Sequence, residues 1–248
     1  MRNIILTVEY DGSRYHGFEN LGSDSFSGTT VAGKLKEVIK KMTQEDDVEL
    51  ICGFRTEVGV HAYAQVVNFL TSSSLPTEDI RHYMNKYLPM DIAIVEANEA
   101  SQRFHAKLNA KSKTFLFHIF INKEPGVFER KHSAYSLLPI NRKRLGDAAT
   151  LFVGKHDFKH FSNSKSNKST IKEILDINVY GDVDENEIFI TISANDFLYN
   201  MAATIIGTLI EVGSGVRPLS DIPLIFKGEK KASPPCDPKG LFLQKIEY

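Results

Sequence analysis

Cysteine is scarce in this chain of 248 residues, and long apolar runs are missing. The two cysteines, Cys52 and Cys236, stand far apart without metal-ligand spacing, so we expect reduced thiols in a cytosolic protein. No apolar stretch approaches the about 20 residues of a membrane span. The alternating residues 1–12 are typical of a strand and not of a secretory signal. We therefore expect a cytoplasmic protein with no membrane segment.

An excess of charge of one sign is missing as well. The formal net charge is -1 and the pI is near 6.7, so the composition announces no polyanionic partner. A basic face for nucleic acid remains compatible with this balance. Hydrophobic residues make up 42% and charged residues 25%, which is ordinary for globular proteins and allows one large domain or two smaller ones.

Several enzyme motifs are absent. The chain has no phosphate-cradling glycine loop and no Gly-x-Ser-x-Gly elbow. His156 and His160 have the spacing of a helical metal pair, but no glutamate of the zincin type lies between them and no third ligand is evident. We favour two aromatic-flanked histidines on a structural turn over a metal pair.

Apolar periodicity predicts the order β-α-β-β-α-β in the first hundred residues. The same kind of pattern follows in the second half, where the helix at 197–213 is so apolar that we expect it to be buried. This order is the split β-α-β arrangement of a ferredoxin-like unit. We predict an α+β fold with an N-terminal half at 1–104 and a C-terminal half at 105–248. The expected strands are 4–10, 48–53, 63–70, 91–97, 113–121, 171–180, 187–194 and 240–248, and the expected helices are 29–42, 76–88, 142–154, 197–213 and 219–228.

One short stretch, "GFRTEVGVHA" at 53–62, is dense in functional groups. Taken alone, it is equally well explained as a strand-end turn. In that interpretation Gly59 supplies a positive φ, and Arg55 and Glu57 form a surface pair. The functional interpretation makes Glu57 a reacting carboxylate.

Six stretches in order shift the balance: "YDGSRYHGF" at 10–18, "RTEVGVHA" at 55–62, "LPMDIAI" at 88–94, "RFHAKLNAKSKTF" at 103–115, "NDFLYNMAATIIGTLIEVG" at 195–213 and the ending "SPPCDPKGLFLQKIEY". Together they resemble the tRNA pseudouridine synthases of the TruA type from end to end. The resemblance implies two ferredoxin-like halves whose sheets join around a central cleft, and a homodimer that grips tRNA. It also implies isomerisation of uridine to pseudouridine in the anticodon stem-loop, at positions 38–40 of the tRNA, without metal or cofactor.

The resemblance also assigns roles to single residues. Glu57 stands where the family has its catalytic aspartate, and Arg55 stands where an arginine opens the substrate and holds the target nucleotide. Phe115 occupies the place of a stacking tyrosine, and Ala203 that of the buried arginine that pairs with the carboxylate. The longer Glu57 side chain moves the carboxylate by about 1.5 Å, one C–C bond.

Four cations are our candidates for RNA phosphate contacts: Arg14, Lys107, Lys111 and Lys113. A solvated surface location explains them equally well.

Glu57, Phe115 and Ala203 differ from the residues that the family has at these positions, and two hypotheses follow. The first is an active synthase that uses Glu57 as nucleophile or base, and the alternative is a catalytically impaired, TruA-like RNA-binding protein. A ferredoxin-like scaffold without an RNA role is a third hypothesis, and salt-sensitive tRNA binding would count against it.

Overall fold

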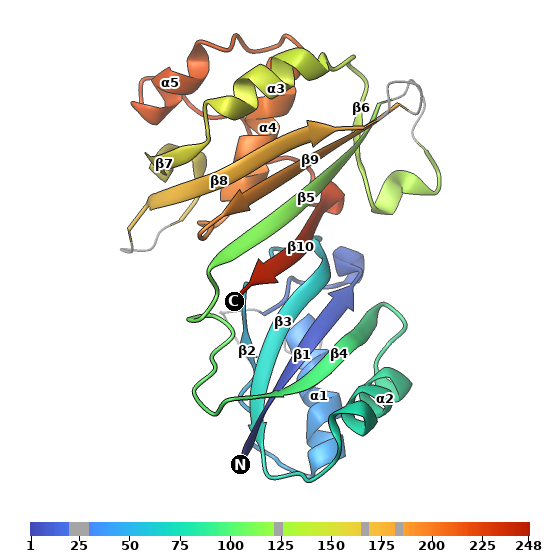
Figure 1. The fold of residues 1–248 in the computed structure, drawn as a ribbon. Coiled ribbons are helices and arrows are strands. Elements are labelled where there is room, and N and C mark those ends of the chain that lie inside the picture. The colour runs from blue at the N-terminus through green and yellow to red at the C-terminus, as the bar shows by residue number, and fades with distance from the viewer. Residues whose placement is uncertain (20–29, 122–125, 165–168, 182–185) are drawn as a thin grey trace. The chain divides into compact units, whose positions relative to one another are not determined.

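Two units make up the chain in a computed structural model that describes residues 1–19, 30–121, 126–164, 169–181 and 186–248 (Figure 1). Unit 1 comprises Met1–Lys111 together with Leu243–Tyr248, and unit 2 comprises Ser112–Phe242. Each unit combines strands with helices, so the predicted α+β class is confirmed.

Unit 1 has the predicted element order β-α-β-β-α-β. Strand β1 (Arg2–Tyr10) pairs antiparallel with β3 (His61–Thr71) and with β4 (Ile92–Ala100), and β2 (Ile51–Cys52) pairs with β3. The resulting strand order β4-β1-β3-β2 fits a split β-α-β unit. Here β2 is much shorter than the expected strand 48–53.

Helices α1 (Val31–Thr43) and α2 (Thr77–Tyr87) complete unit 1. Every second residue of β1 is buried, as its alternating pattern predicts. Helix α1 begins after Thr30, whose hydroxyl oxygen accepts a 3.1 Å hydrogen bond from the amide of Gly33. The buried side chains of α1 and α2 are Val31, Ala32, Leu35, Val38, Ile39, Met42, Ile80 and Met84.

Unit 2 is built on antiparallel strands. Strand β5 (Ser112–Ile121) pairs with β9 (Glu187–Ala194), β9 with β8 (Ile171–Tyr180), and β8 with β7 (Gly154–Asp157). The short β6 (Ala134–Ser136) adds to β5 in parallel. Strand β10 (Leu241–Glu247) begins in unit 2 and ends in unit 1, where its later residues lie beside β3. The helices are α3 (Arg142–Thr150), α4 (Met201–Gly213) and α5 (Asp221–Phe226), and the described single turns are η1 (Gly12–Arg14), η3 (Glu129–Lys131), η4 (Lys159–Phe161) and η5 (Pro238–Gly240).

Helix α4 is buried on nearly all sides, as predicted, with only Ile210 and Glu211 partly exposed. It begins at Met201 and not at the expected residue 197, because Asn200 adopts a left-handed φ of 59° that cannot continue a helix. Helix α3 likewise ends at Thr150, before the expected closing glycine, since a tight turn follows it. Within the described ranges, no helix is both long and apolar enough to cross a bilayer.

Two glycines test how tightly α4 is packed. A Cβ on Gly207 would lie 2.2 Å from the carbonyl oxygen of Pro234, whereas a Cβ on Gly146 of α3 would meet nothing within 4 Å. We expect Gly207→Ala to lower the free energy of unfolding by about 1–3 kcal/mol through overpacking. Gly146→Ala should raise it by about 0.5–1 kcal/mol through helix propensity. Urea denaturation of both variants measures this, and equal effects would contradict the close approach of α4 to residue 234.

Candidate active site

The loop that follows β2 carries Arg55, Thr56 and Glu57 in three different environments. Arg55 is exposed, Thr56 is buried and Glu57 is half-buried. The loop leaves the sheet at Gly53, whose amide donates a 2.8 Å hydrogen bond to the carbonyl of Val66. It turns at Gly59, which has the expected positive φ of 80°. The stretch is therefore a structured turn that presents a carboxylate of intermediate exposure.

Thr56 is the buried anchor of this loop. Its hydroxyl shares a 2.7 Å hydrogen bond with the hydroxyl of Tyr10 at the end of β1, and its carbonyl accepts a 3.1 Å bond from the amide of Phe18. Burial raises the pKa of Tyr10 well above its ordinary value, against the lowering effect of hydrogen bonds to Thr56 and Gln65. The negative charge of Glu57 acts in the same direction as burial. Tyr10 is therefore neutral, and its hydroxyl holds the loop through a bond in which either hydroxyl can donate.

Arg55 forms an ion pair within unit 1. Its Nε lies 2.8 Å from Oε2 of Glu19, and its side chain is 42% exposed. The strand-end-turn interpretation paired Arg55 with Glu57, whereas the structure pairs Arg55 with Glu19, in the segment after β1. This contact leaves part of the guanidinium open to solvent.

His61 ties the same loop to the turn after β1. Its Nδ1 accepts a 3.1 Å hydrogen bond from the amide of Gly12, and the side chain is 1% exposed. Oδ1 of Asp11 lies 3.2 Å from the same nitrogen. Because Nδ1 accepts this bond, the buried His61 side chain connects the turn after β1 to the loop after β2.

Phe115, the predicted stacking residue, lies on β5 in unit 2 and is 1% exposed. Its ring meets the edge of Phe197 at a centroid distance of 5.1 Å and an interplanar angle of 90°. Such a T-shaped contact fixes the orientation of a ring.

Lys113 precedes Phe115 by two residues on the same buried face of β5. Its Nζ lies 2.8 Å from Oδ1 of Asp196, and Nζ of Lys172 lies 3.1 Å from the other carboxylate oxygen. Burial favours the neutral acid, but the two lysines outweigh it and lower the pKa of Asp196. Lys113, expected from the sequence to contact an RNA phosphate, is thus part of a buried ion-pair network that the sequence did not predict. The alternation of β5 places residues 113 and 115 on one face and was the available signal.

Ala203 lies in the first turn of α4 and is 9% exposed. Its carbonyl accepts a 2.9 Å hydrogen bond from the amide of Cys236. The place of the expected arginine is thus an aliphatic position on a buried helix.

The other predicted RNA contacts lie at the surface of unit 1. Arg14 is exposed and its Nε lies 2.8 Å from Oδ2 of Asp91. Asp91 also accepts a 2.6 Å hydrogen bond from Tyr15, and burial, assisted by this bond, raises the pKa of Tyr15 to about 12. Lys107 and Lys111 are exposed in the segment between β4 and β5.

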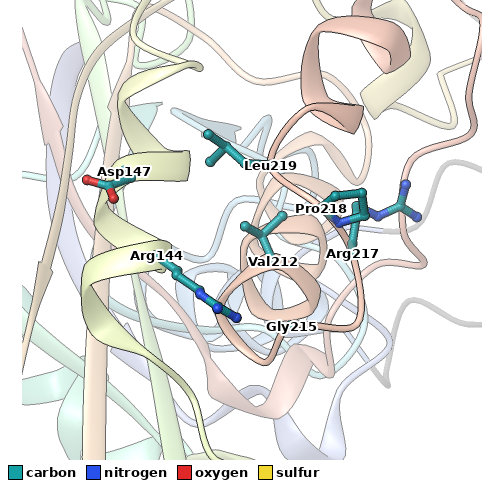
Figure 2. A pocket seen from close by; sticks show the side chains of 7 residues that line it. All are labelled: Arg144, Asp147, Val212, Gly215, Arg217, Pro218 and Leu219. Carbon is teal, nitrogen blue, oxygen red and sulfur yellow. The ribbon is translucent and has the colours of Figure 1, made fainter.

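A shallow cavity of about 370 Å³ lies between α3 and the end of α4. Figure 2 shows that its polar side chains do not converge, since Asp147 and Arg217 both point away from its centre. Arg217 is engaged elsewhere, with its Nε 2.9 Å from Glu211. We assign no ligand to this cavity.

Comparison with known proteins gives a consistent result. The sequence model of a family described as tRNA pseudouridine synthase matches residues 6–109 and 148–248. The chain is 38% identical over 251 residues to tRNA pseudouridine synthase A 2 of Bacillus anthracis, with 100% of both chains covered. The chain belongs to the tRNA pseudouridine synthase family.

A second member of the tRNA pseudouridine synthase family, synthase A of Caldicellulosiruptor bescii, is 39% identical over 251 residues with the same full coverage. Among solved structures, a chain titled "Crystal Structure of a Cbf5-Nop10-Gar1 Complex" matches at 9% identity and a TM-score of 0.40, covering 86% of this chain and 44% of that one. That likeness is too weak to support any conclusion. The predicted family resemblance is confirmed by the first two relatives and the family match.

Removal of the Tyr10 hydroxyl tests the anchoring of the loop. We expect Tyr10→Phe to lower the free energy of unfolding by about 1–2 kcal/mol, because Thr56 loses a buried hydrogen bond. Tyr87→Phe on α2, whose ring is 53% exposed, is the matched control and should change it little. Urea denaturation monitored by fluorescence measures both, and equal losses would contradict the anchoring role.

The network around Asp196 predicts a pH dependence. A folded-state pKa below the unfolded value, about 3.9, stabilises the protein above that pH and loses its effect as pH falls through the folded pKa. We expect Asp196→Asn to cost roughly 1 kcal/mol near neutral pH, a modest amount because the carboxylate is 45% exposed. The difference from wild type should shrink as the pH drops below about 4. Denaturant titrations of both proteins at neutral pH and below pH about 4 check this expectation. A difference in free energy of unfolding that does not change with pH would rule out the charge interaction.

Proposed function

We propose that the protein isomerises uridine to pseudouridine in tRNA, with Glu57 as the reacting carboxylate. The observation that carries the proposal is the anchored loop, in which buried Thr56 holds Arg55 exposed and Glu57 half-buried at consecutive positions. Membership of the tRNA pseudouridine synthase family supplies the reaction class. By resemblance the target lies in the anticodon stem-loop.

The reaction needs few groups from the protein. Uracil is detached from C1′ of the ribose, rotates, and is rejoined through C5, so the product is an isomer of the substrate. A carboxylate serves as nucleophile or base at the sugar or the ring. The target nucleotide must leave the base stack, because its glycosidic bond is not approachable within a stack.

The other residues take supporting roles in this proposal. Arg55, held by Glu19, contacts the nucleotide. Phe115, packed on Phe197 and 1% exposed, offers a ring face to the uracil only after that face is uncovered. Arg14, Lys107 and Lys111 contact phosphates. Lys113 would do so only after leaving Asp196, so it is the least accessible of the four proposed cations.

The two halves of the chain have different roles in this proposal. We assign the catalytic loop to the N-terminal half, 1–104, and the completion of the site to the C-terminal half, 105–248. The family resemblance supports a cytoplasmic homodimer that acts on tRNA without a cofactor.

One observation favours a second candidate function, tRNA binding without turnover. Ala203 is a buried aliphatic residue where the resemblance calls for an arginine that pairs with the carboxylate. A carboxylate without that cation is a weaker acid and is ionised less readily. The longer side chain of Glu57 also shifts the reacting oxygen, and a displacement near 1 Å can cost on the order of 100-fold in rate.

Pseudouridine mapping on unmodified tRNA separates the two candidates. We expect product with wild type, a loss of at least about 1,000-fold in single-turnover rate with Glu57→Ala, and RNA affinity retained within a few-fold. Glu9→Ala removes an exposed carboxylate of the same unit and should leave the rate unchanged.

The absence of pseudouridine would favour the second candidate function. If wild type forms no more pseudouridine than Glu57→Ala while both bind tRNA, the protein is an RNA-binding member of the family. The double change Glu57→Asp with Ala203→Arg then shows whether restoring the family residues restores turnover.

A further inference from the structure

A second cavity of unit 2, of about 510 Å³, lies beside the start of α4. Its wall comes from three segments that are distant in sequence: residues 160–163 after β7, Thr204 in the first turns of α4, and residues 228–235 before β10. We call it the α4 cavity. Its described lining residues are His160, Ser162, Asn163, Thr204, Gly228, Lys230, Lys231, Ala232, Ser233, Pro234 and Pro235, and none of these is acidic.

The rim segment 228–236 is held firmly against α4. The amide of Cys236 bonds to the carbonyl of Ala203 at 2.9 Å, and the amide of Ser233 donates to the hydroxyl of Thr208 at 3.4 Å. Arg217 donates a 3.2 Å hydrogen bond to the carbonyl of Lys231. The backbone that carries both lysines is therefore fixed before any ligand arrives.

The charge of the α4 cavity is positive. Nζ of Lys230 lies 2.6 Å from Oδ1 of Asp221, and Nη1 of Arg217 lies 3.4 Å from Oδ2 of the same residue, so that carboxylate is shared by two cations. Lys231 is exposed, and its ammonium makes no ion pair with any residue that the structure describes. His160 is a further wall residue, and its ring lies against Gly228.

Neutral donors complete the wall. Thr204 is 5% exposed, and its hydroxyl forms no hydrogen bond with the described residues. The hydroxyl of Ser162 accepts from the amide of Ser164, which leaves its own proton available.

We propose that the α4 cavity binds a phosphate group, with Lys231 as the principal cation and Thr204 as a buried donor. Phosphate is the anion that suits a fixed set of ammonium and hydroxyl donors whose lining holds no carboxylate. The neighbouring carboxylates, Asp221 and Glu211, are bound to Lys230 and Ser233 and are not among the lining residues. Its source is the RNA backbone, and this part rests on the proposed action on tRNA. Free phosphate is the other source of the same chemistry.

Salt-dependent tRNA binding tests the RNA source. Lys231→Ala should weaken binding of unmodified tRNA by roughly five-fold at low salt and reduce the slope of log affinity against log salt by about one. Lys227→Ala removes an exposed charge directly before the rim segment, outside the cavity, and is the matched control. Equal effects of the two variants would overturn the RNA source.

Titration of the full chain with inorganic phosphate tests the site itself. The imidazole signals of His160 should shift on addition of phosphate to wild type and to Lys227→Ala, and shift much less in Lys231→Ala and Thr204→Val. Unchanged signals in wild type would overturn the phosphate site. If phosphate shifts the His160 signals of wild type but Lys231→Ala binds tRNA as well as wild type does, the cavity binds free phosphate and not the RNA backbone.

These readouts are independent of turnover. All binding measurements are repeated in the Glu57→Ala background, so a protein that binds tRNA without forming pseudouridine still gives a result. Failure of the proposed activity and failure of the α4 cavity are therefore distinguished.

Discussion

The buried hydrogen bond between Tyr10 and Thr56 is the constraint on which the candidate site depends. Tyr10 ends the central strand of unit 1, and β1 is fixed by antiparallel pairing on both sides. A hydroxyl at that position is therefore placed by the whole sheet. The loop inherits this rigidity at Thr56, so that the two flanking side chains, Arg55 and Glu57, start from a defined backbone.

Charge is arranged differently in unit 2. An aliphatic side chain, Ala203, stands where the family resemblance calls for a cation, yet a buried lysine lies on the strand of Phe115. A buried ammonium is tolerated only when it is paired, and Asp196 provides the partner. Unit 2 therefore contains a buried cation, Lys113, but this cation is paired with Asp196 of the same unit.

Periodicity was enough to predict most of the fold. The alternation of β1 and the all-apolar pattern of α4 follow directly from which faces are buried. Helix ends were predicted less well, because the left-handed backbone of Asn200 is a property of one residue in its tertiary setting. Strand β2 is short for a similar reason, since its extent is set by pairing with β3 and not by its own pattern.

The candidate site divides in the same way. Arg55, Glu57 and Phe115 were found through an ordered set of motifs, whereas the bond from Tyr10 to Thr56 joins residues 46 positions apart and has no local signal. The pair of Lys113 with Asp196 spans 83 positions. Contacts of this kind depend on the register of distant strands, which a single sequence does not encode locally.

The close approach of α4 to the backbone at Pro234 has a thermodynamic consequence. Helix and rim share one packed interface, so the rim cannot come away without exposing the core face of the helix. A ligand held by the rim would then favour the folded state of unit 2 by mass action, by RT ln(1 + [L]/Kd). Ligand binding in the α4 cavity and the folding stability of unit 2 would therefore rise and fall together.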